Sequence, residues 1–474
     1  PSPHDPATAY VAATRYKLDD RAPYLYKTSD YGQTWTRIVD GIPAADFTRV
    51  IREDPERRGL LYCGTESGVY VSFDDGAHWQ ALRGGAKPLP VVPIHDLAVK
   101  GSDLIAATHG RSFWILDDLT PLRQMRPEIA EAPAHLFAPR PAIRYRSAMS
   151  RFREPGKAAR DYLAAGAAQV TVRRKGTEEQ FLDAGANPPD GVIVTYWLKE
   201  KPEGEVTLTF LDADGKEIRT FSSEPQEPPA DANGAEHGEQ HAKKKEPRVP
   251  KEAGTNRFVW NLRYPDARDV TPPAVLWAGS LRGPLAMPGR YQVRLTVGDR
   301  SYTEWFEVRP DPRVTVSQAD LEAQFNLLLQ IRDKLSATHD AIMQIRDLRT
   351  QARTWQQRAR DLAGGEAIAA AAQALIEELT AIEEELIQVK AKEIEDPLNF
   401  PVKLNNKLAA LINIVDSADA APTRQAVETF HELAAAIDAQ LDRLAALIER
   451  NVTALNRQIH EAALPALAPS ARGR

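Results

Sequence analysis

Up to about residue 120 the chain alternates short apolar runs with turns rich in Gly, Asp and Pro. Short runs enriched in β-branched and aromatic residues predict strands rather than helices. Beyond about residue 315 the apolar residues recur every three or four positions, which predicts helices. The sequence therefore predicts a multidomain protein whose earlier regions are built from strands and whose last region is helical.

A short motif occurs twice in the first region, as TSDYGQTW at 28–35 and as SFDDGAHW at 72–79. The two copies are 44 residues apart, and an Asp-Pro pair followed by an apolar run precedes each of them. The shared positions are Thr28 and Ser72, Asp30 and Asp74, Gly32 and Gly76, and Trp35 and Trp79. We expect these residues to be structural. The Asp caps N–H groups of its own turn, the Gly supplies backbone freedom, and the Trp anchors the returning strand in the core.

Repeats of about 44 residues with four short strands each are typical of β-propeller blades. A third unit without the motif follows, with strands expected at 95–99, 103–108 and 112–116. Residues 1–124 are therefore predicted to be the last two to three blades of a truncated propeller. Propellers have about 4–8 blades, so we expect the remaining blades upstream of residue 1 or, alternatively, in another chain.

The two copies of the motif resemble the Asp-box (BNR) repeats of sialidases, xyloglucanases and the sortilin ectodomain. Residues 107–118 (ATHGRSFWILDD) look like the closing segment of the large exported bacterial sortilin-like propeller proteins, which are often labelled glycosyl hydrolases. The resemblance extends, with less distinctive motifs, over most of the remaining chain. It implies the C-terminal part of such a protein and a periplasmic or secreted location. His109 and Arg111 in this segment are candidate residues of a binding face of the propeller. Because the box occurs in unrelated propellers, it indicates the fold more strongly than the function.

The middle of the chain is predicted to contain an extended connector at 125–186, which its prolines keep out of a helix, and a β-sandwich at 187–312. About six short strands favour an immunoglobulin-like or fibronectin-III-like sandwich, a module that usually serves as a spacer or binding platform. Residues 224–253 are rich in Pro, Glu and Lys with few apolar residues, so we expect a disordered insertion there.

Two features of this insertion could suggest a ligand site. His237 and His241 have the spacing of metal ligands, but only on a helix, and the composition of the loop predicts solvated linker residues instead. The run of three lysines at 243–245 has acidic neighbours and is also predicted to be solvated.

Residues 315–462 are predicted to form an antiparallel helical bundle, followed by a flexible tail at 463–474. An N-cap at Ser317 begins the first helix, which is unusually long. The apolar stripes of the helices are interpreted as bundle core, and the alternative is a coiled coil with another subunit, which would mediate self-association. The acidic run at 383–385 is expected to be a solvated face, and His339 and His431 are expected to be surface residues.

Composition adds few constraints. Hydrophobic residues make up 43% of the 474 residues and charged residues 27%, and the formal net charge is −6. These values are ordinary for a globular protein and give no reason to expect a nucleic-acid partner. No apolar run is long enough to span a membrane. The single cysteine, Cys63, is expected to be a small buried residue on a strand.

A glycosidase of the usual type needs two carboxylates that flank the scissile bond. The candidate residues in the propeller segments are Arg15, Asp19, Asp20, Asp46, Asp96, His109, Arg111 and Asp117, and nothing in their spacing selects a pair. We therefore predict no catalytic residue, no metal and no cofactor in this chain. The predicted function is binding or scaffolding, with a glycan or protein ligand on the propeller. The alternative is a sialidase-like or xyloglucanase-like glycoside hydrolase whose catalytic residues lie mostly in upstream blades.

Overall fold

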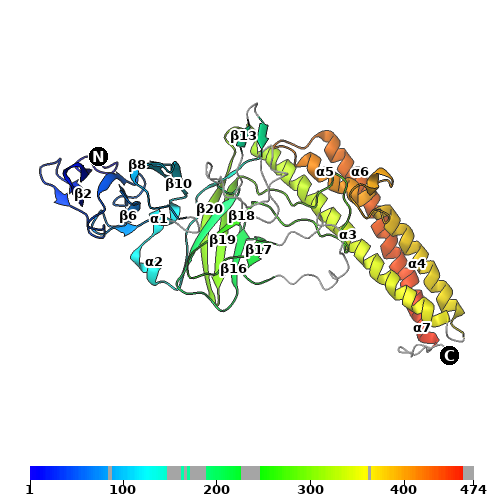
Figure 1. Cartoon of the computed structure of the whole chain (residues 1–474). Coiled ribbons are helices and arrows are strands. Elements are labelled where there is room, and N and C mark those ends of the chain that lie inside the picture. The colour runs from blue at the N-terminus through cyan, green and yellow to red at the C-terminus, as the bar shows by residue number, and fades with distance from the viewer. Residues whose placement is uncertain are drawn as a thin grey trace.

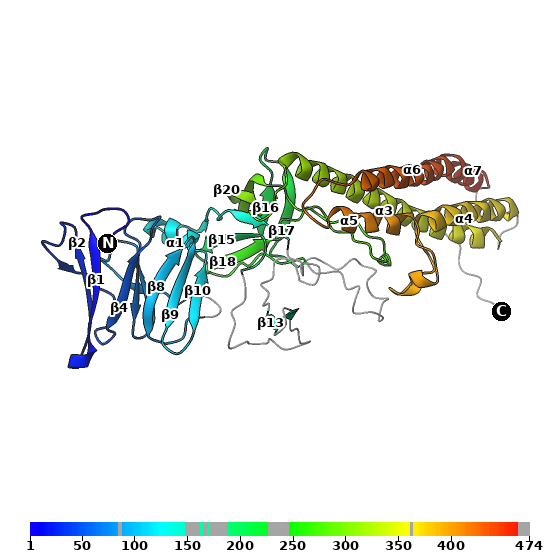
Figure 2. The ribbon, with the colours of Figure 1, turned by 90° about the horizontal axis from the view of Figure 1, so that it is seen from above.

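A computed structural model describes residues 1–83, 88–146, 188–225, 246–360 and 364–462, with the hairpin of β13 (Tyr162–Ala164) and β14 (Ala168–Val170). The chain is multidomain and elongated. Three small sheets at the N-terminal end are followed by a pair of sheets packed on each other and then by long helices (Figure 1). The view from above shows the same order, so the small sheets and the helices lie at opposite ends of the molecule (Figure 2).

The three N-terminal sheets are antiparallel, and each is built from strands that are consecutive in the chain. Sheet A contains β1 (Ala9–Arg15), β2 (Asp20–Thr28) and β3 (Thr36–Arg37), and the 3-10 helix η1 (Tyr16–Leu18) joins β1 to β2. Sheet B contains β4 (Thr48–Glu53), β5 (Leu61–Thr65), β6 (Val69–Ser72) and β7 (Gln80–Ala81). Sheet C contains β8 (Ile94–Lys100), β9 (Asp103–Thr108) and β10 (Phe113–Asp117).

Sheet B is packed between sheets A and C. The apolar cluster between A and B contains Leu25, Ile51, Leu61 and Trp79, and the cluster between B and C contains Tyr62, Val71, Leu97 and Leu104. The sheets approach closely at Gly64 of β5, where a Cβ atom would lie 2.7 Å from side-chain atoms of both Val50 and Ile94. Cys63 of β5 is buried, as the sequence predicts, and burial raises the pKa of its thiol.

The buried carboxylate of Asp54 holds the segment that follows sheet C against sheet B. This segment contains two short helices, α1 (Thr120–Gln124) and α2 (Pro127–Glu131). Asp54, which is fully buried at the end of β4, accepts hydrogen bonds from Arg123 Nε at 3.0 Å and from the Tyr62 hydroxyl at 3.1 Å. The charge of Arg123 therefore compensates the carboxylate and attaches the segment to sheet B.

The next two sheets, D and E, pack face to face around one apolar core. Sheet D has the order β11 (Ala134–Leu136), β15 (Val192–Leu198), β18 (Gly254–Trp260). Sheet E has the order β12 (Ala142–Arg144), β20 (Arg300–Pro310), β19 (Gly289–Val297), β16 (Val206–Leu211), β17 (Glu217–Ser222). The core between them includes the aromatic residues Phe210, Phe221, Phe258, Trp260 and Phe306.

The described part of the predicted connector at 125–186 differs from a plain extended segment. It contains α2 and two edge strands. Strand β11 lies at the edge of sheet D, and β12 lies at the edge of sheet E. Each of these strands is only three residues long and lies close to prolines. Prolines are tolerated at sheet edges because the N–H that they lack is not needed there for a hydrogen bond to another strand.

The predicted insertion at 224–253 falls largely outside the described residues, as do His237, His241 and the lysines at 243–245. From residue 246 the chain packs on the sandwich. Val249 is 2% exposed, and its N–H donates to the carbonyl of Ser222 at 3.0 Å. Glu246 forms an ion pair with Arg219 of β17. Residues 246–250, which were expected to belong to the disordered insertion, are thus held on the sandwich by a buried apolar residue, a backbone hydrogen bond and an ion pair.

The C-terminal region is helical, and its first helix is much longer than the others. It contains α3 (Gln318–Arg360), α4 (Glu366–Leu386), the 3-10 turn η4 (Asp396–Leu398), α5 (Leu404–Val415), α6 (Arg424–Leu447), the π-helical segment η5 (Ile448–Val452) and α7 (Thr453–Glu461). Ser317 Oγ accepts the N–H of Asp320 at 3.1 Å, which is the predicted N-cap. No described helix combines the length and the apolarity that a membrane crossing requires. The predicted tail at 463–474 lies outside the described residues.

Two residues that were expected at the surface are buried instead. His339 of α3 is fully buried, with Nδ1 2.6 Å from the carbonyl oxygen of Arg268, and burial lowers the pKa of its imidazole. Glu383 of α4 is 1% exposed and is paired with Arg346 and Arg349 of α3. The partners are distant in the sequence, so the local composition gave no sign of either burial. His431 is exposed, as predicted.

A network of buried charges joins the sandwich to the helices. Asp416, after α5, accepts hydrogen bonds from Arg146 Nη2 at 2.7 Å and Arg263 Nη1 at 2.8 Å. Asp419 lies 2.5 Å from both Arg144 Nη1 and Arg146 Nε. Burial alone would raise the pKa of Asp416, but the charges of Arg263 and Arg146 outweigh it and hold the pKa below its usual range.

We expect Asp416→Asn to lower the free energy of unfolding of the helical region by about 3–5 kcal/mol, because it leaves buried guanidinium groups without their counter-charge. Urea unfolding followed by helical circular dichroism measures this effect. The control is Asp438→Asn, which removes the half-exposed partner of Lys334 and should cost less than about 1 kcal/mol. Equal losses of unfolding free energy in the two variants would show that the buried charges do not stabilise the contact between the sandwich and the helices.

Candidate functional site

The two copies of the repeated motif form the hairpins β2–β3 and β6–β7, and both are held by the same hydrogen bonds. In the first, Asp30 Oδ1 accepts the N–H of Thr34 at 2.9 Å and the Thr28 hydroxyl at 2.7 Å. The Thr28 hydroxyl in turn accepts the N–H of Gly32 at 2.9 Å. Hydrogen bonds from Thr34 and Thr28 lower the pKa of Asp30 to about 2.

The second copy repeats this arrangement with other side chains. Asp74 Oδ1 accepts the N–H of His78 at 2.9 Å and the Ser72 hydroxyl at 2.8 Å, and Ser72 Oγ accepts the N–H of Gly76 at 2.9 Å. The glycines have positive φ, 84° at Gly32 and 88° at Gly76, where an L side chain would be strained. The His78 ring lies 2.6 Å from Asp74 Oδ2, and this contact raises the pKa of the imidazole.

The two tryptophans of the motif differ in their surroundings. Trp79 is 4% exposed, and its Nε1 donates to the carbonyl of Ile38 in the preceding unit at 2.9 Å. Trp35 is 44% exposed, and its Nε1 donates within its own turn to Gly32 at 3.1 Å. The anchoring predicted for both tryptophans therefore holds for Trp79 and not for Trp35, because no described sheet packs on the outer side of sheet A.

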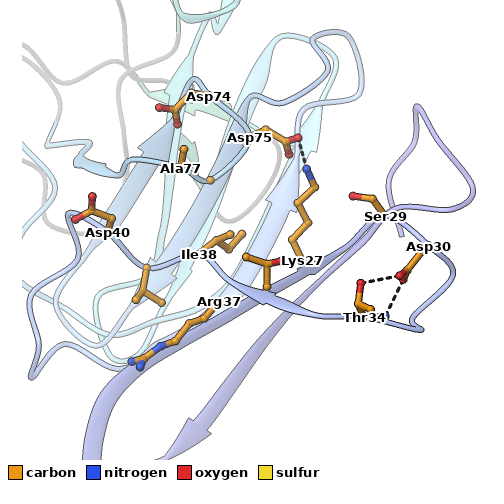
Figure 3. A pocket seen from close by; sticks show the side chains of 13 residues that line it. Lys27, Ser29, Asp30, Thr34, Arg37, Ile38, Asp40, Asp74, Asp75 and Ala77 are labelled. Carbon is orange, nitrogen blue, oxygen red and sulfur yellow. Dashed lines mark hydrogen bonds and ion pairs between the residues drawn. The ribbon is translucent and has the colours of Figure 1, made fainter.

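A hollow of about 830 Å³ lies between the two hairpins, and Figure 3 shows the side chains that line it. Four aspartates contribute to it, but most of their oxygens already have partners within the protein. Asp75 is paired with Lys27 Nζ at 2.5 Å and accepts the Tyr10 hydroxyl at 2.6 Å. Asp30 and Asp74 hold their own turns. We therefore assign structural roles to Asp30, Asp74 and Asp75.

The opposite ends of the same sheets carry a different set of side chains. Here η1, the start of β4, the β5–β6 turn, the start of β8 and the β9–β10 turn lie together, and we call this surface the turn face. Its defining residues are Tyr16, Phe47, Arg49, Glu66, His95 and His109. These residues come from three consecutive sheets, so the surface exists only when the sheets are packed together.

Two stacked rings and an ion pair form one half of the turn face. The rings of Tyr16 and Phe47 are 5.0 Å apart at an angle of 17°. The guanidinium of Arg49 lies over both rings, 5.6 Å from the centre of Tyr16 and 5.0 Å from that of Phe47. Arg49 Nε and Nη2 also donate to Glu66 Oε2, at 2.8 and 2.5 Å. The aromatic rings and the carboxylate thus fix the guanidinium in one position.

Two histidines form the other half. The rings of His95 and His109 are 4.6 Å apart and tilted by 36°. The N–H of His109 donates to the carbonyl of Pro93 at 2.9 Å, which ties the β9–β10 turn to the loop before β8. Desolvation lowers the pKa of His95, and the positive charges of Arg49 and His109 lower it further, against the opposite effect of Glu66.

The other candidate residues of the propeller segments lie at separate places. Arg111 is exposed, two residues after His109 in the same turn. Arg15 pairs with Asp20 at 3.1 Å, and Arg52 pairs with Asp96 at 2.6 Å. The remaining carboxylates are Asp19, which caps η1, Asp46, which accepts from Thr65, Ser67 and Tyr70, and Asp117, whose pKa is raised by burial and by Asp103.

His109 is a candidate from the sequence alone, whereas the residues around it are not. A signal was present, because Thr65 and Thr108 occupy the same place in successive units, so that Glu66 and His109 follow equivalent strands. Tyr16, Phe47 and Arg49 carry no comparable signal, since each contact depends on the packing of neighbouring sheets. Within the described ranges no three His, Cys, Asp or Glu side chains converge in a way that could hold a metal ion.

No protein-family model matches the chain, and a search of curated proteins gives no significant match. Among solved structures, the extracellular domain of a B. thetaiotaomicron protein described as a one component system is 8% identical, with a TM-score of 0.17, covering 60% of this chain and 28% of that one. A GH74 xyloglucanase from Xanthomonas campestris is 13% identical, with a TM-score of 0.20, covering 67% of this chain and 38% of the enzyme. A GH74 enzyme from Niastella koreensis is 12% identical, with a TM-score of 0.20, covering 65% and 45%.

This chain spans less than half of the length of these three structures. TM-scores this low do not by themselves indicate a shared fold.

The hydrogen bonds of the second hairpin lead to a prediction about stability. We expect Asp74→Ala to lower the free energy of unfolding by about 1–3 kcal/mol, because N–H groups of the turn lose their acceptor. The exposed Asp40, which lies 3.9 Å from His78, provides the control Asp40→Ala, with an expected change within about 0.5 kcal/mol. Urea unfolding followed by tryptophan fluorescence measures both. Our structural assignment would be wrong if Asp74→Ala left stability unchanged and abolished ligand binding.

Proposed function

We propose that residues 1–124 are the last two to three blades of an Asp-box β-propeller and that the protein is an exported, non-catalytic binding or scaffolding protein. The turn face is its binding surface. The observation that carries this proposal is the convergence of aromatic, cationic and imidazole side chains from three consecutive sheets on one end of those sheets. Side chains that only stabilised single sheets would have no reason to gather in this way.

The propeller part of the proposal rests on the repeated units. Two hairpins have the same hydrogen bonds at the same positions, and the third unit continues the order of strands. Among the described strands, sheet A has no counterpart of β4 and sheet C has none of β7. On the outer strands Val11 is 43%, Phe113 72% and Ile115 57% exposed. Neighbouring blades on both sides would cover these apolar residues.

Binding is favoured over hydrolysis by the state of the carboxylates. A glycosidase needs one carboxylic acid and one carboxylate on either side of the bond that it breaks. Glu66 of the turn face is held by Arg49, and Asp46 nearby accepts three side-chain hydrogen bonds. Carboxylates engaged in this way are poor general acids or nucleophiles. The sandwich and the helices then serve as a platform that positions the propeller, and the helices are also the region through which self-association would occur.

The turn face can be tested with an array of immobilised oligosaccharides. We expect at least one class of saccharide to bind and Tyr16→Ala to weaken that binding about tenfold or more, because an exposed aromatic ring contributes strongly to recognition. Tyr31→Ala is the matched control, since Tyr31 is 75% exposed in the first hairpin at the other end of sheet A. Absence of any binding to the array would exclude a glycan ligand, and equal effects of the two substitutions would exclude the turn face as the site.

The non-catalytic part of the proposal has a direct test. The chain should release no reducing sugar from xyloglucan and no sialic acid from sialosides, because the carboxylates described at the turn face and in the hollow are held by other partners. A colorimetric reducing-end assay and a sialic-acid assay measure these products. Turnover that persisted through purification and was lost in Glu66→Gln would overturn the non-catalytic reading in favour of a hydrolase.

A further inference from the structure

We propose that the turn face binds an acidic saccharide, whose anionic group lies against His95, His109 and Arg49, and that binding is accompanied by uptake of a proton. This inference rests on the proposed binding function and specifies the chemistry of its ligand. It is carried by the arrangement of three cationic or protonatable groups beside an exposed aromatic ring.

The first step is the position of the two imidazoles. His95 comes from β8 and His109 from the β9–β10 turn, and both side chains are exposed at the surface. Their rings nevertheless lie 4.6 Å apart. Two imidazoles at this distance repel each other when both are protonated, unless an anion lies against them. An anion at this place would have ring N–H donors from two different elements.

The second step is the balance of charge around the pair. Arg49 of β4, His95, His109 and the exposed Arg111 of the same turn are cationic or can be protonated, and Glu66 is the carboxylate that contacts Arg49. Glu66 accepts from Nε and Nη2 of Arg49, which are two of the three guanidinium nitrogens. Glu66 and the nearby buried Asp46 supply two negative charges, fewer than the positive charges of Arg49, Arg111 and two protonated histidines together. The turn face therefore attracts a ligand that supplies further negative charge.

The third step is the coupling to protons. Desolvation and the positive charges of Arg49 and His109 lower the pKa of His95. A bound anion would favour the imidazolium and raise this pKa above its value in the free protein. A group with a higher pKa in the complex takes up a proton on binding, so the affinity must increase as the pH falls toward and below the ordinary pKa of histidine, about 6.5.

The last step is the class of ligand. Tyr16 is 42% exposed, and its ring is stacked on the buried Phe47 directly beside Arg49. A sugar ring has an apolar face that can pack on such a ring while an acidic substituent reaches the cationic groups. The aromatic ring and the cations are thus matched to the two chemically different parts of an acidic saccharide. An acidic peptide without apolar side chains would contact the cations but not the ring of Tyr16.

Isothermal titration calorimetry of the full chain with an oligogalacturonide tests the proposal. We expect the affinity to increase about tenfold or more between about pH 7.5 and pH 5.5, as one additional charge contact would require. Titrations in two buffers with different ionisation enthalpies should show proton uptake. A sulfated disaccharide should behave alike if the site recognises any anionic sugar, whereas a neutral cello-oligosaccharide should bind weakly and without dependence on pH.

The variant His95→Gln should lose the pH dependence, and His109→Gln should weaken binding because it removes a contact to the anion. His431→Gln should retain the pH dependence because His431 is an exposed histidine on α6. In the unsubstituted protein, histidine NMR signals should show that the pKa of His95 rises when the oligogalacturonide is added. This second measurement does not depend on the folding of any variant.

The possible failures are distinct. Equal binding of neutral and acidic saccharides, independent of pH, would overturn this inference and leave the proposed binding function intact. Proton-linked binding of an acidic peptide in place of the saccharides would overturn the ligand class. Absence of any ligand on the turn face would overturn the proposed function as well.

Discussion

The arrangement of this chain depends on a small set of buried charges between its sandwich and its helices. Asp416 and Asp419 are removed from water together with three arginines from two separate places in the sequence. Buried ions are costly unless each has its partners in good geometry, so the network tolerates few relative positions of the two domains. The network contributes less to the free energy of folding than to fixing the orientation of the helices relative to the sandwich. The same principle recurs at Asp54 with Arg123 and at Glu383 with Arg346 and Arg349.

Each N-terminal sheet is too small to be stable alone, so the sheets depend on packing against one another. The hairpins of sheets A and B are closed by aspartates that satisfy the N–H groups of the turn, and sheet-to-sheet packing supplies the core. Because these hairpins take up one end of the two sheets, other turns lie at the opposite end. The turn face lies at this opposite end. The hydrogen bonds of the hairpins fix one end of the sheets, and the side chains at the other end are available to contact a ligand.

Features with a local cause could be predicted from the sequence. The spacing of Asp30 and Asp74 indicated the hairpins, the apolar periodicity indicated the helices, and Ser317 marked the start of α3. Features that depend on distant partners could not. His339 is covered by the segment around Arg268, Glu383 by arginines of α3, and Trp35 lacks the packing that Trp79 obtains from Ile38. His109 could be selected, whereas Arg49 and His95 became candidates only when three sheets were seen together.

The length of α3 has a mechanical consequence. Its 43 residues form a continuous rod of about 65 Å, since an α-helix rises about 1.5 Å per residue. The near end of this rod lies at the sandwich and its far end is distant from every sheet (Figure 1). A rotation of only about 5° at the junction would displace the far end by about 6 Å, by simple leverage over that length. A small change of fit at the sandwich is thus magnified at the tip of the helices.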